Sequence, residues 1–64
     1  MWKIIHIVSN ETKAKNIQDK LTLEGFLVKI QPVNRHKKEG YYQILVPGEE
    51  AQEAYNILLE IGLL

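Results

Sequence analysis

Hydrophobic and polar residues divide the chain into five segments with two different periods. Residues 2–8, 26–33 and 41–46 are rich in β-branched and aromatic residues, which predicts three strands. Residues 11–24 carry apolar side chains at three- and four-residue spacing, which predicts an amphipathic helix. A second helix is predicted to open at residues 47–50, so the expected order of elements is β-α-β-β-α.

The ends of both predicted helices carry local signals. Ser9 or Asn10 can accept hydrogen bonds from the free N–H groups of the first helical turn. Gly25 and Gly62 follow the two helices at positions typical of a left-handed helix end. The residues expected to form the stripes are Ala14, Ile17, Leu21 and Glu24 in the first helix, and Ala51, Ala54, Leu58 and Ile61 in the second.

The order of elements limits the topology. A polar loop over residues 34–40 favours a hairpin between the second and third strands, which makes them antiparallel. The economical arrangement is the split β-α-β unit, in which the third strand lies between the first two. We therefore predict an α+β fold, a ferredoxin-like βαββα two-layer sandwich. Its three-stranded antiparallel sheet has the order 1-3-2 and both helices on one face.

This arrangement leaves one sheet face and the edge of the first strand without cover. After Gly62 only two residues remain, too few for a fourth strand beside the first. Strand alternation suggests that Ile5, Ile7, Val28, Ile30, Ile44 and Val46 face the helices, although it cannot decide which side of the first strand is buried. The residues then expected on the open side, as a candidate interface, are Trp2, Ile4, His6, Val8, Leu27, Tyr41 and Leu45.

Composition excludes several classes of function. The chain has 64 residues, no cysteine and a formal net charge of zero. We expect one domain over residues 1–64, without disulfides and without a thiolate metal site. Zero net charge argues against a dedicated nucleic-acid binder. No segment has the length and apolarity of a membrane span or a signal peptide, so a cytoplasmic location is expected.

Candidate chemistry is sparse. Glu49, Glu50 and Glu53 crowd the start of the second helix, where carboxylates usually stabilise the helix dipole. Ser9 is the only serine and is expected to serve as a helix cap, and no His, Cys, Asp or Glu spacing resembles a metal site. We therefore predict a protein that is not an enzyme and uses no cofactor or metal.

One dense basic cluster falls in the predicted hairpin loop. Arg35, His36, Lys37 and Lys38 follow one another, and Lys29 on the second strand can extend the patch. Such a cluster can bind the phosphate of a nucleotide or metabolite, or it can simply keep the loop solvated. No glycine-rich phosphate cradle accompanies it, so the solvated loop is the simpler interpretation.

The chain resembles a known family over nearly its whole length. The similarity lies in Trp2–Val8, Ser9-Asn10, Leu23-Glu24-Gly25-Phe26, Tyr42–Pro47 and the acidic, Ala-rich residues 49–54. It looks like the small bacterial "signal transducing protein" family of unknown function, which has a βαββα core related in shape to PII-type regulators. A sporulation-related peptidoglycan-binding repeat has a similar succession of strands and helices. The resemblance implies a bacterial protein and brings no catalytic residues.

The expectation for function is therefore a non-enzymatic regulatory or protein-interaction module. It would self-associate as a homodimer, or bind another protein, through the open sheet face or the edge of the first strand. The alternative is a sensor of a small anionic ligand that uses the basic hairpin loop. RNA binding through Trp2 and Tyr41 is a weaker option, because the third strand departs from the aromatic signature of RNA-recognition domains.

Overall fold

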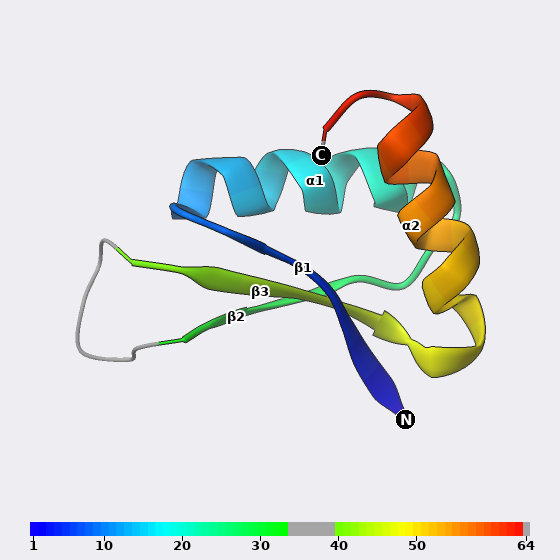
Figure 1. Ribbon diagram of the computed structural model, residues 1–64, viewed down its shortest axis with the longest axis horizontal. Helices are drawn as coiled ribbons and strands as arrows, with labels where there is room; N and C mark the ends of the chain where they lie inside the picture. The colour runs from blue at the N-terminus through cyan, green and yellow to red at the C-terminus, as the bar shows by residue number, and fades with distance from the viewer. Residues whose placement is uncertain (34–39, 64) are drawn as a thin grey trace.

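The computed structural model describes residues 1–33 and 40–63. Figure 1 shows a single sheet with two helices packed on one side of it. In chain order the elements are β1 (Trp2–Val8), α1 (Glu11–Leu23), β2 (Lys29–Pro32), β3 (Tyr42–Pro47), the 3₁₀ turn η1 (Gly48–Glu50) and α2 (Ala51–Glu60).

The sheet has the predicted topology. Its strand order is β1-β3-β2, and β3 pairs antiparallel with both of its neighbours. Both helices contact β1 and β3, and α1 also contacts β2. The fold is therefore an α+β sandwich of two layers, consistent with a ferredoxin-like βαββα arrangement, and the prediction of fold class is confirmed.

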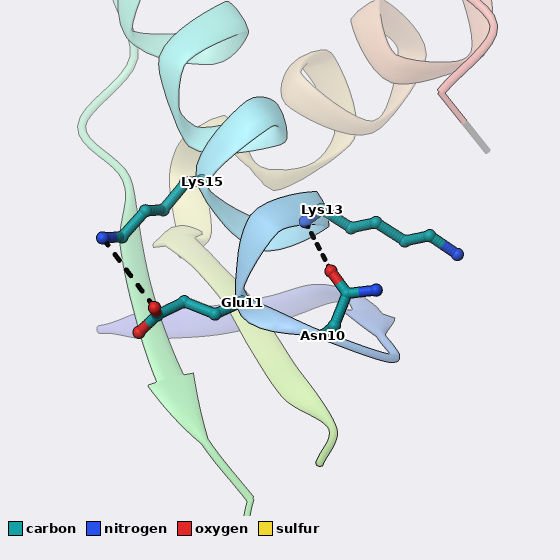
Figure 2. A network of polar contacts seen from close by, with 4 residues as sticks. All are labelled: Asn10, Glu11, Lys13 and Lys15. Carbon is teal, nitrogen blue, oxygen red and sulfur yellow. Dashed lines mark hydrogen bonds and ion pairs between the residues drawn. The ribbon is translucent and has the colours of Figure 1, made fainter. Parts of the chain in front are cut away.

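The helix ends follow the local signals in the sequence. Asn10 caps α1, because its side-chain Oδ1 accepts a 2.8 Å hydrogen bond from the backbone N–H of Lys13 (Figure 2). Gly25 and Gly62 follow the two helices with φ angles of +95° and +74°. Only glycine adopts these angles without steric cost, which is why the helices end where the sequence predicts.

The core lies between the helices and the covered face of the sheet. Leu21, Ile44, Val46 and Leu58 are its largest fully buried side chains. Phe26, Val28 and Ile30 pack against them from the second predicted strand, although only Lys29–Pro32 of that segment pairs as β2. Two members of the expected stripes lie just beyond the helices and are exposed. Glu24 is the C-cap of α1. Ile61 is exposed, because α2 ends at Glu60 and Ile61 forms its cap rather than part of its last turn.

A β-bulge in β1 changes which side chains face the helices. Ile4 pairs with Leu45 and His6 pairs with Ile44, so Ile5 is an extra residue between two consecutive pairs. Beyond the bulge the alternation of β1 is reversed. The expectation that Ile7 faces the helices, with His6 and Val8 on the other side, is therefore wrong. Strand parity assumes an unbroken ladder, and a single inserted residue inverts every position after it.

Candidate functional site

The sheet face that the helices do not cover carries exposed apolar side chains. Paired residues of neighbouring strands share a face, so the strand register identifies its members. The residues of this open face are Trp2, Ile4 and Ile7 from β1, Gln43, Leu45 and Pro47 from β3, and Lys29 and Gln31 from β2.

The three apolar residues that β1 contributes to the open face are only half covered. Trp2, Ile4 and Ile7 are 42%, 45% and 49% exposed. They occupy one edge of the face, while Lys29, Gln31 and Gln43 supply its polar positions. The described open face contains no carboxylate. It is an apolar patch with one cation, a composition typical of an interaction surface.

Leu45 is the exception on the open face, because it is only 8% exposed without being part of the core under the helices. In the register it lies between Ile4 on β1 and Lys29 on β2. The Lys29 Nζ lies 4.9 Å from the centroid of the Trp2 ring, so this cation–π contact joins the two edge strands across β3. The aliphatic stem of Lys29 and the Trp2 ring therefore shield the middle of the face.

Two predicted interface residues lie on the covered side instead. Val8 pairs with Tyr42 and belongs to the core, where it is not accessible to a partner. His6 pairs with Ile44 and is half-buried on the helix side of β1. Both positions follow from the bulge at Ile5. Ile7 lies on the open face, where simple alternation had placed His6 and Val8.

Tyr41 and Leu27 are exposed, as an interface residue must be, but they flank the sheet. Tyr41 immediately precedes β3 and is 61% exposed. Leu27 precedes β2, has no partner in the strand register and is 66% exposed. The structure thus brings Trp2, Ile4 and Leu45 together on one surface, whereas Tyr41 and Leu27 lie outside the paired strands.

The edge of β1 is free along the described chain. β1 pairs with β3 on one side, and none of the described residues pairs with it on the other. An edge of this kind can accept a strand from another molecule, although the bulge at Ile5 interrupts the row of hydrogen-bonding groups. The open face and the β1 edge meet along Trp2, Ile4 and Ile7.

The predicted anion patch is only partly described. Arg35, His36, Lys37 and Lys38 lie outside the described residues, so their role remains a prediction. Lys29, which was expected to extend this patch, directs its amine to the Trp2 ring instead. The described part of the patch therefore belongs to the open face.

The carboxylates do not gather into a site. Glu49 and Glu53 are exposed and Glu50 is half-buried, in η1 and the first turn of α2. In residues 1–33 and 40–63 no group of three His, Cys, Asp or Glu side chains could hold a metal ion. The Ser9 hydroxyl accepts a hydrogen bond from the Lys13 amine at 3.4 Å, which ties the end of β1 to α1.

Sequence reasoning missed one concave region. A groove of about 470 Å³ lies where β1 runs into α1, with the turn after α2 on its other side. His6, Ser9, Lys13 and Asn16 supply its polar lining from β1 and α1, and Tyr41 adds a phenol from the start of β3. The spacing of Ser9, Lys13 and Asn16 could have indicated a shared helix face. Nothing in the sequence marks the bulge that turns His6 toward them.

Neither described helix combines the length and apolarity that crossing a bilayer requires. No family model, curated protein or solved structure matches this chain.

Proposed function

We propose that this protein is a non-catalytic interaction module that associates with a second copy of itself through the open face and the adjoining edge of β1. The observation that carries the proposal is the half-exposed row of Trp2, Ile4 and Ile7. Burying this row removes apolar surface from water at roughly 25 cal/mol per Å². A two-layer domain with one uncovered face can obtain this burial from a partner that covers the face.

The electrostatics of the open face support a second copy as the partner. Lys29 is its only described charge, and that amine is already held over the Trp2 ring. Packing two such faces together buries no carboxylate and brings no dense cluster of like charge into contact. The formal net charge of zero also removes the long-range repulsion that keeps charged proteins apart.

The resemblance to bacterial signal-transducing proteins adds a biological setting to the proposal. In that setting the dimer is a regulatory component of the bacterial cytoplasm, and its output depends on association rather than on catalysis. Because fold-level likeness alone does not determine function, the interface is the part of the proposal to test first.

The test measures the mass of the protein in solution by size-exclusion chromatography with light scattering. We expect a dimer at high micromolar concentration, with the emission of the single tryptophan, Trp2, shifting to shorter wavelength as the dimer forms. Ile4→Lys places a charge in the centre of the interface and is expected to give a folded monomer. Leu59→Lys is the matched control, because Leu59 is equally apolar and 55% exposed but lies on α2.

Circular dichroism establishes that each variant is folded. If Ile4→Lys does not fold, Ile7→Lys tests the same surface at a position that pairs with Gln43 rather than with Leu45. A wild-type protein that stays monomeric at high micromolar concentration contradicts the proposal. So does a dimer that Leu59→Lys disrupts and the open-face variants leave intact.

A further inference from the structure

We infer that the groove between the end of β1, the first half of α1 and the turn after α2 is a binding site for a small organic anion with an apolar part. This inference concerns a surface within one copy of the chain. The groove shares Ile7 with the open face, whereas its polar lining lies outside that face.

The polar lining of the groove consists of side chains that can donate hydrogen bonds, and they come from three parts of the chain. His6 and Ser9 come from β1 and its end, Lys13 and Asn16 from α1, and Tyr41 from the start of β3. No carboxylate of the described residues lines the groove. A set of donors without an acidic partner is the complement of a phosphate or carboxylate group.

Lys13 is the lysine of the groove lining, and its positive charge is the reason to expect a negatively charged ligand. Its Nζ lies 3.4 Å from the Ser9 hydroxyl, which holds the amine at the rim of the groove. Its backbone N–H is occupied by Asn10, so the ligand is recognised by side chains rather than by the end of the helix. No carboxylate among the described residues forms an ion pair with Lys13.

Lys15 provides a useful contrast on the same helix. Its amine lies 3.9 Å from Oε1 of Glu11, so its charge is already partly neutralised. Figure 2 shows Lys15 and Glu11 on one side of α1, with the Lys13 side chain extending in the opposite direction. The two lysines therefore differ in surroundings although they share a helix and a charge, which makes Lys15 the natural control.

The bulge in β1 contributes to building the groove. In an unbroken ladder, with Ile5 paired to Ile44, alternation would turn His6 toward the open face. With the bulge, the imidazole lies half-buried on the helix side, in the same groove as Lys13 and Asn16. Bulges commonly re-aim a side chain beside a functional site, and here the re-aimed residue is a hydrogen-bonding imidazole.

The remaining lining of the groove indicates the rest of the ligand. Ile7, Val8, Ile17 and Leu63 supply apolar surface beside the donors. A groove of about 470 Å³ falls in the range of small-molecule sites, which combine apolar walls with a few polar groups. The chemistry therefore fits an aromatic or aliphatic molecule that carries a phosphate or carboxylate, rather than a bare inorganic ion.

The test titrates probes of graded chemistry into the full chain and follows backbone amide resonances by NMR. The probes are phenyl phosphate, benzoate, inorganic phosphate and phenol. We expect saturable shifts of Ser9, Lys13, Tyr41 and Gly62 with phenyl phosphate or benzoate, and weaker binding of inorganic phosphate and phenol. The comparison of phenyl phosphate with benzoate distinguishes the two anionic groups.

Two variants assign the binding to the groove. Lys13→Gln is expected to weaken the affinity for the better probe by about tenfold or more, because one charge-assisted hydrogen bond is lost. Lys15→Gln is expected to leave the affinity unchanged. His6→Gln keeps a side-chain donor but alters its position, and a severalfold weaker affinity is expected.

Three outcomes overturn the inference. The first is the absence of saturable shifts with every probe at low millimolar concentration. The second is equal weakening by Lys13→Gln and Lys15→Gln, which would indicate non-specific attraction to basic α1. The third is binding of phenol as tight as that of phenyl phosphate, which would indicate an apolar site without a preference for anions.

Discussion

The two faces of the sheet are built from similar residues but have different surroundings. On the covered face, Ile44 and Val46 of β3 are fully buried beneath the helices. On the open face, Ile4 and Ile7 of β1 are half-exposed, and only Leu45 is shielded. The aliphatic residues are of the same kind in both cases. The difference lies in what packs over them.

This comparison shows that cover, rather than hydrophobicity, distinguishes the core from the candidate interface. The covered face receives two helices whose apolar stripes fit against it. The open face receives only the Lys29–Trp2 contact across its centre, which protects Leu45 and leaves the β1 edge bare. An apolar surface that a small domain leaves exposed is therefore a candidate site for binding a partner.

The largest expected contrast between the two faces is in stability. Ile44→Ala removes fully buried methyl groups and leaves a cavity, which is expected to cost about 2–5 kcal/mol of the free energy of unfolding. For a chain of this length that loss is a large share of a total of roughly 3–10 kcal/mol. Ile4→Ala on the open face is expected to cost about 1 kcal/mol or less in the separated monomer.

Urea denaturation of both variants at low protein concentration measures this difference. Equal losses at the two positions would mean that the open face is as well packed as the core, and would remove the basis for the interface.

A deletion at the bulge gives the next largest effect. Deletion of Ile5 is expected to leave the pairs Ile4–Leu45 and His6–Ile44 in place, because Leu45 and Ile44 are consecutive on β3. The cost is the packing of Ile5 against the core, about 1–2 kcal/mol for a partly buried side chain. Ile5→Ala is the matched control, since it loses similar packing but keeps the bulge.

Cross-strand nuclear Overhauser effects check the outcome of the deletion. A contact of Val8 with Tyr42 is expected in the wild type and in both variants. Exposure of Val8 after the deletion would contradict the register in which Ile5 is the unpaired, extra residue.

The smallest expected effect concerns the contact over the centre of the open face. Lys29→Met keeps an apolar stem over the face but removes the cation above Trp2, at an expected cost of about 0.5–1 kcal/mol. The emission of Trp2 should change with it, whereas Lys3→Met should leave the emission nearly unaltered. Identical spectra for Lys29→Met and the wild type would show that the contact is not populated in solution.

Local signals in the sequence predicted much of this fold correctly. Asn10 and Gly25 mark the ends of α1, because capping and a positive φ are properties of a few neighbouring residues. The order of strands followed from the short hairpin and the preference for compact connections. Trp2, Ile4 and Leu45 were assigned to the open face correctly, since they lie before the bulge or on the regular β3.

The candidate sites depended more on long-range pairing. Alternation along β1 placed Ile7 on the covered face and His6 on the open face. Both assignments were wrong, because both residues lie beyond the bulge at Ile5. The groove itself combines residues from the end of β1, from α1 and from the turn after α2. Such a combination cannot be read from the spacing within any one segment.

The sequence by itself thus determined the elements, their order and the caps of α1, since these depend on hydrogen bonds and side-chain periods within a few residues. Tertiary structure alone decided which side of β1 is covered. That choice rests on the pairing of β1 with β3, where one extra residue reverses the direction of every side chain that follows. Strand pairing also decides the contact between the Lys29 amine and the Trp2 ring. The two residues lie on opposite edge strands, so they come into contact only when β3 is paired between them.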